Sequence, residues 1–156
     1  MKKSYIVYTV LTLGCAVLAV LIARADIMSI IDPATLAIIL GPTILMLLSH
    51  FGPRDCVSAF RSAMTGSGAG EVELKNSLLF FSTAQTLLIV SGIAAVFIGL
   101  ILILDGMAMG KAESAKILAR WFSVDIIAVL YTALLMILVT VPFKSAAQKR
   151  LNELRR

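Results

Sequence analysis

The chain has 156 residues, of which 60% are hydrophobic and only 15% are charged. Its mean hydropathy is +0.98. Because soluble domains are about half apolar and about a quarter charged, this composition predicts a membrane protein. Four helices of ~20 to 27 residues with short connections account for the length and leave no room for a soluble catalytic domain. We therefore expect an all-α, polytopic membrane protein that is not an enzyme and has no cofactor.

The net charge of +5 does not indicate a nucleic-acid partner, because the basic residues flank apolar segments and do not form a patch. Cys15 and Cys56 lie on either side of a complete apolar segment, so we expect no disulfide between them within one chain. The sole histidine, His50, has no second ligand at metal-binding spacing, so no metal site is expected.

Hydropathy divides the chain into four apolar segments with short polar connections. The expected order is a first span at 5–23, a second at 33–51, an interfacial helix and glycine-rich linker at 52–76, a third span at 77–104, an outer loop at 105–116, a fourth span at 117–143 and a basic tail at 144–156.

The first segment has an alternative interpretation as a signal peptide. Two lysines precede its apolar run, and small residues surround Arg24, as at a cleavage site. The run from Ile6 to Ala23 is longer than the ~7 to 15 residues of a usual signal peptide, so a spanning helix is preferred and cleavage stays an alternative.

Basic residues predict the orientation. With four spans, the N-terminus, the 52–76 connection and the C-terminal tail share one side of the membrane. That side holds ten lysines and arginines, against four on the other. Because positive charge collects on the cytoplasmic side, both termini are expected inside.

Local signals mark the second span. Asp32 can cap free amides and Pro33 is preorganised for a first helical turn, so a helix is expected to start there. Gly41 and Pro42 are expected to kink this helix unless a neighbour or Thr43 supplies the missing hydrogen bond.

Small residues favour close helix packing in the third span. Ser91, Ala95 and Gly99 repeat every four residues, with Gly92 alongside. Small side chains at this period allow helices to approach closely in lipid, so we expect this stripe to be a helix-packing face within or between subunits.

Asp125 is the one acidic residue inside a predicted span, about one turn from its outer end. On a helix it shares a stripe with Val129, Thr132 and Met136. One interpretation is an acid that faces a lumen and attracts cations or carries a proton. The other, slightly favoured because one turn is shallow, is a carboxylate that reaches the surface or pairs with Arg120.

Four stretches also occur in a familiar order. They are Ile31 to Thr43, Arg54 to Phe60, Gly92 to Ile101, and Ala128 to Pro142 followed by a basic helix. In this order they resemble the second span, the first inner helix, the third span and the fourth span of the MotA branch of the MotA/TolQ/ExbB proton-channel family.

This resemblance implies a homo-oligomer such as a pentamer, in the bacterial inner (cytoplasmic) membrane. The ring would surround a MotB/ExbD/TolR-like single-span partner that carries a protonatable aspartate. Ion flow past that aspartate drives flagellar rotation or work on the outer membrane. The residues expected to face the pore are Asp125, Val129, Thr132, Met136, Ser82, Gln85, Gly92 and Val96.

The chain departs from the family pattern in three respects. Val96 and Val129 stand where the family carries threonines near the partner's aspartate. Gly41-Pro42-Thr43 replaces Gly-Gly-Thr, and the large inner domain between spans two and three is missing. Two alternative functions therefore stay open: a non-conducting structural subunit of a larger complex, and a small four-helix transporter that uses Asp125.

Overall fold

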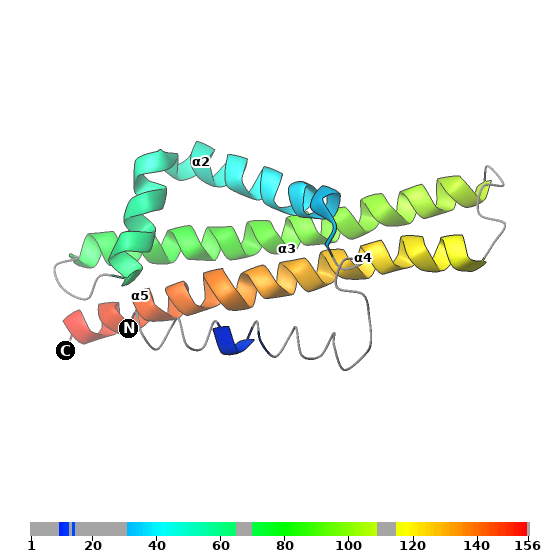
Figure 1. The fold of residues 1–156 in the computed structure, drawn as a ribbon. Coiled ribbons are helices and arrows are strands. Elements are labelled where there is room, and N and C mark those ends of the chain that lie inside the picture. The colour runs from blue at the N-terminus through cyan, green and yellow to red at the C-terminus, as the bar shows by residue number, and fades with distance from the viewer. Residues whose placement is uncertain (1–9, 13, 15–30, 65–69, 109–114, 156) are drawn as a thin grey trace.

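The computed structural model describes residues 10–12, 14, 31–64, 70–108 and 115–155, and every element among them is a helix (Figure 1). The elements after the first few residues are α2 (Pro33–Met64), α3 (Glu71–Ala108), α4 (Ala115–Leu135), the π-helix η2 (Met136–Thr140) and α5 (Val141–Leu154).

Three of the described helical stretches are long and apolar enough to cross a membrane: Pro33–Met64, Glu71–Ala108 and Trp121–Leu154. The chain is therefore a membrane protein with several apolar helices. Most of the expected first span at 5–23 lies outside the described residues. The linker at 65–69 and most of the outer loop lie outside them too.

A long antiparallel hairpin is the centre of the fold. α3 forms one arm, and α4, η2 and α5 run on without interruption to form the other (Figure 1). α2 begins beside the middle of the hairpin, packs along α3, and then turns so that its last part lies across α3 and α5. The end of the hairpin remote from the C-terminus therefore extends beyond the start of α2.

The start of α2 is capped and tied to α4. The Asp32 carboxylate accepts a hydrogen bond from the Ala34 amide at 3.2 Å and another from the Thr35 hydroxyl. The Asp32 amide donates to the Tyr131 hydroxyl at 2.8 Å. The helix begins at Pro33, the position at which proline costs no hydrogen bond.

Gly52, and not Gly41 or Pro42, is where α2 leaves helical geometry. Its φ of 73° and ψ of 161° lie in a region open essentially to glycine alone, and Pro53 disfavours a helical conformation in the residue before it. At the expected kink the dihedral angles stay helical. There the Thr43 hydroxyl donates to the Ile39 carbonyl at 2.7 Å, whereas the carbonyl for which Pro42 has no amide donor is that of Ile38.

The π-helix has a cause in the sequence. Pro142 has no amide hydrogen, and its ring would collide with a carbonyl one turn earlier in a regular α-helix. The wider turn just before it, with the Val141 amide bonded to the Met136 carbonyl, accommodates the ring without a break. The expected basic tail at 144–156 is therefore a helical continuation of the fourth span as far as Leu154.

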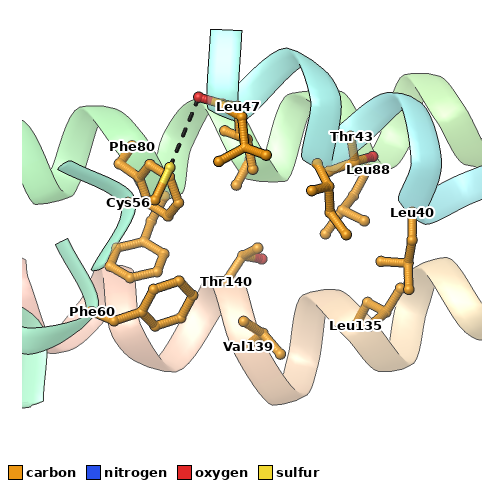
Figure 2. Close-up of a pocket in the computed structure, with 14 residues that line it drawn as sticks. Leu40, Thr43, Leu47, Cys56, Phe60, Phe80, Leu88, Leu135, Val139 and Thr140 are labelled. Carbon is orange, nitrogen blue, oxygen red and sulfur yellow. Dashed lines mark hydrogen bonds between the residues drawn. The ribbon is translucent and has the colours of Figure 1, made fainter. Parts of the chain in front are cut away.

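An aromatic cluster holds the last part of α2 against the hairpin. Phe60 makes edge-to-face contacts with Phe80, Phe81 and Phe143, at centroid distances of 5.1 to 5.7 Å. Beside the cluster, under the Gly52 bend, lies an apolar cavity of about 300 Å³ (Figure 2). The Cys56 thiol on its wall points to the Leu47 carbonyl, 3.9 Å away. The cavity offers no charged group, so we assign it no chemistry.

Arg150 of α5 secures the C-terminal end of α2. Its guanidinium donates to the Ser62 carbonyl at 2.6 Å and to the Met64 carbonyl at 3.2 Å. Both carbonyls belong to the last turn, where a helix leaves acceptors without partners and where its dipole attracts positive charge.

We predict that Gly52→Ala destabilises the protein by about 1–3 kcal/mol, because the new side chain is strained at this φ and ψ. Gly41→Ala is the matched control. Its Cβ would meet no neighbouring element and its φ is not positive, so the gain from helix propensity and the cost of a Cβ before Pro42 should leave stability within about 1 kcal/mol of the wild type. Unfolding titrations in SDS micelles measure both, and equal effects would contradict the assignment of the bend to Gly52.

Candidate functional site

Three glycines of α3, spaced seven residues apart, form the contact with α4. A Cβ at Gly92 would overlap the Thr132 side chain, a Cβ at Gly99 would overlap the Asp125 carboxylate, and a Cβ at Gly106 would overlap the Trp121 indole. A seven-residue step is nearly two helical turns, so the three positions lie on one line. We call this line the glycine seam. It lets the two helices approach closely, as small residues do in membrane proteins.

The residues of the predicted packing stripe, Ser91, Ala95 and Gly99, do not all face the same helix. The Ser91 hydroxyl lies 3.3 Å from the Thr43 hydroxyl of α2, and Ala95 packs with Ile39 of α2 and Ala128. Gly99 instead faces α4. Ser91 and Ala95 thus contact α2 and its neighbours, whereas the contact of α3 with α4 repeats every seven residues. The repetition of glycine at 92, 99 and 106 was the sequence signal that could have revealed it.

Five of the predicted pore-facing residues line one groove between α3 and α4. The groove has a volume of about 400 Å³ and is lined by Ile89, Gly92, Ile93, Val96, Phe97, Val129, Thr132, Ala133 and Met136. We call it the hairpin groove. The positions of α3 that pack on α2, such as Leu88 and Ala95, lie across the glycine seam from it. Its walls are open to the surroundings, with Val129 58% and Phe97 60% exposed.

The hairpin groove is lined by apolar side chains, apart from one hydroxyl group that is already hydrogen-bonded. The Thr132 hydroxyl donates to the Ala128 carbonyl at 2.9 Å, so its hydrogen is used within α4. Val96 and Val129 add only methyl groups. The groove can therefore pack against an apolar helix but does not itself offer a polar path for an ion.

Ser82 and Gln85, also predicted to face a pore, lie elsewhere. The Lys144 ammonium of α5 donates to the side-chain amide oxygen of Gln85, Oε1, at 3.1 Å and lies 3.4 Å from the Ser82 hydroxyl. The polar first third of the third span thus holds a half-buried ammonium group. Because α3 and α5 are antiparallel, these residues lie nearer the C-terminal end of the hairpin than the groove does.

Asp125 lies one turn from Val129 and lines a different groove. This second groove has a volume of about 330 Å³ and is lined by Gly99, Leu102, Ile103, Asp105, Gly106, Trp121, Val124 and Asp125. We call it the acidic groove. Its residues come from the end of α3 and the start of α4, and this end of the hairpin extends past the start of α2 (Figure 1).

The Asp125 carboxylate is buried between α3 and α4, with 7% of the residue exposed. One oxygen, Oδ1, sits in the space left by the missing side chain of Gly99. The other, Oδ2, is buried and has no hydrogen-bond partner among the described residues. The predicted pairing with Arg120 involves a side chain that lies outside those residues.

His50 is far from this carboxylate in the fold. It is exposed near the Gly52 bend, and its Nδ1 lies 3.0 Å from the Met46 carbonyl. Within the described part of the chain, no three His, Cys, Asp or Glu residues lie close enough together to hold a metal ion. The chemistry available there is that of one buried carboxylate and two grooves.

Comparisons with known proteins add no assignment: no family model, no curated protein and no solved structure matches the chain.

We predict that Gly99→Ala destabilises the hairpin by about 1–3 kcal/mol, because its methyl group would displace a buried carboxylate. Asp125→Ala removes the carboxylate that the new methyl group would meet. The double variant should therefore be destabilised by about 0.5–3 kcal/mol less than the sum of the two single destabilisations. SDS unfolding titrations of the four proteins measure this coupling. Strict additivity would show that the two residues are not in contact.

Proposed function

We propose that the chain is a MotA-like subunit of the bacterial inner membrane, assembled as a homo-oligomeric ring around the spanning helix of a partner protein. The observation that carries the proposal is the hairpin groove. Five residues that we expect to face the pore line this one apolar groove, and two of them, Val96 and Val129, are at positions that the resemblance aligns with the family's pore: Gly92, Val96, Val129, Thr132 and Met136.

The shape of the groove favours a helix as its occupant. Gly92 at its base and Ala133 on its wall leave a depression between larger side chains, among them Phe97 and Met136. Ridges of side chains on one helix pack into such depressions on others. In lipid, where burial of apolar surface gives little driving force, this kind of shape match is a main source of association.

The distribution of basic residues supports a cytoplasmic C-terminus. Seven basic residues of the described segments gather at the C-terminal end of the hairpin, on the last part of α2, the start of α3 and α5: Arg54, Arg61, Lys75, Lys144, Lys149, Arg150 and Arg155. The opposite end, with the acidic groove, then faces outward.

Subunit counting tests the ring. In lipid nanodiscs or mild detergent, native mass spectrometry should find one defined homo-oligomer larger than a dimer, with a pentamer expected from the resemblance. Val129→Trp would fill the hairpin groove, where the proposal places the partner's helix, and should lower the apparent association constant of the co-purified single-span partner by at least about tenfold, the equivalent of ~1.4 kcal/mol. Leu45→Trp, which adds the same bulk at a 68% exposed position of α2, is the control.

A strictly monomeric wild-type protein would refute the ring. Equal amounts of co-purified partner with Val129→Trp and Leu45→Trp would show that the groove does not hold the partner's helix.

A second candidate function is a non-conducting structural subunit of a larger complex. The apolar walls of the hairpin groove favour it, because Val96 and Val129 lack hydroxyls and the Thr132 hydroxyl bonds within its own helix. Proton flux into dye-loaded liposomes, with any co-purified partner present, tests it. This function predicts flux no greater than in empty liposomes. A wild-type flux that Asp125→Asn abolishes would exclude it.

A further inference from the structure

We propose that the acidic groove, between the ends of α3 and α4 remote from the C-terminus, binds a small organic cation: an ammonium ion that carries an apolar substituent. The site is formed by Asp125, Asp105 and Trp121 within a single chain. It goes beyond the proposed ring and does not depend on it.

The buried carboxylate is the first observation. A charged oxygen that has lost its water without gaining a partner is costly, so membrane proteins pair such groups or direct them to a ligand. Asp125 is 93% buried and lines the groove, and its Oδ2 has no hydrogen-bond partner among the residues described. A cation in the acidic groove would supply the missing partner.

The glycine seam holds the two recognition groups side by side, which is the second observation. Gly99 leaves the space that the Asp125 carboxylate occupies, and Gly106 leaves the space for the Trp121 indole. Because Trp121 and Asp125 are four residues apart on α4, they lie on the same face of the helix. An indole next to a carboxylate is a favourable pair for an ammonium ion, since the ring face attracts cations.

Asp105 adds a second negative charge at the rim. It is exposed and lines the same groove from α3. The field of two carboxylates draws a cation toward the opening, whereas the buried one fixes it. This division predicts that loss of Asp125 weakens binding more than loss of Asp105.

The rest of the lining selects the kind of cation. Leu102, Ile103 and Val124 make the other walls apolar. A divalent metal such as Ca²⁺ requires about six or more oxygen ligands, which two carboxylates among aliphatic side chains do not provide. An ammonium ion with an apolar substituent matches both parts of the lining. The volume of about 330 Å³ is at the lower end of the range for small-ligand sites.

Trp121 makes the test direct, because it is the only tryptophan of the chain. The full-length protein in nanodiscs is titrated with benzyltrimethylammonium chloride at constant ionic strength while indole fluorescence is recorded. We expect a saturable change. Asp125→Asn should weaken the affinity by at least about tenfold and Asp105→Asn by about two- to threefold, as for a buried and an exposed charge. Asp55→Asn, an exposed acid on the far part of α2, should have no effect.

Two further variants distinguish a loss of binding from misfolding of the protein and from pairing of Asp125 with Arg120. Leu102→Phe narrows the groove and leaves both acids in place, so it should also weaken binding even if Asp125→Asn alters the fold. Arg120→Gln removes the nearest basic residue in the sequence and should leave the affinity within about threefold, the range of an exposed pair.

Several results would overturn the site: no saturable change in the wild type, equal affinity in Asp125→Asn, or equal saturation by neutral neopentylbenzene. Saturation by Na⁺ in place of the ammonium ion would do so as well. Binding that appears only in Arg120→Gln would also overturn the site, because it would mean that Arg120 pairs with Asp125 in the wild-type protein and occupies the place of the cation.

Discussion

Close approach of α3 and α4 along three glycines is the constraint on which the rest of the described structure depends. Gly92, Gly99 and Gly106 each face a larger side chain of α4, and none can carry a Cβ without moving it. This contact sets the rotation of each helix about its own axis. It therefore decides which side chains are buried between the helices, which line the hairpin groove and which line the acidic groove.

The position of α2 follows from the hairpin. Its first turn is tied to Tyr131 of α4, and Thr43 meets Ser91 of α3 halfway along. After Gly52 the helix turns across the hairpin, where aromatic contacts and the Arg150 guanidinium hold it. Because α2 begins beside the middle of the hairpin, it leaves the remote end of α3 and α4 uncovered by its own length, and there the acidic groove lies.

Sequence patterns were sufficient for the helical class, the membrane location and the helix start at Asp32 and Pro33. They were not sufficient to predict how each helix is rotated about its axis, that is, which of its faces points toward the other helices. On an apolar helix in lipid, hydrophobicity does not distinguish the face toward protein from the face toward lipid. The non-helical residue of α2, Gly52, directly follows the expected end of the second span at residue 51, whereas Gly41 and Pro42 keep helical dihedral angles.

The predicted stripe on the fourth span shows the same limit. It joined positions four residues apart, although each such step rotates the helix by about 40° beyond a full turn. In the structure the stripe separates into two lines of seven-residue spacing. Asp125 and Thr132 face the glycines, and Thr132 also lines the hairpin groove together with Val129 and Met136.

Disulfide formation between α3 and α4 tests the glycine seam most directly. In a protein whose native cysteines are replaced by serine, cysteines at 95 and 128, two alanines of one buried cluster beside the seam, should form an intrachain disulfide on mild oxidation in membranes. Cysteines at 95 and 126 should not, because Ile126 is 68% exposed and faces away from the seam. Cross-linking of the second pair without the first would contradict the rotation of the helices, and with it both grooves.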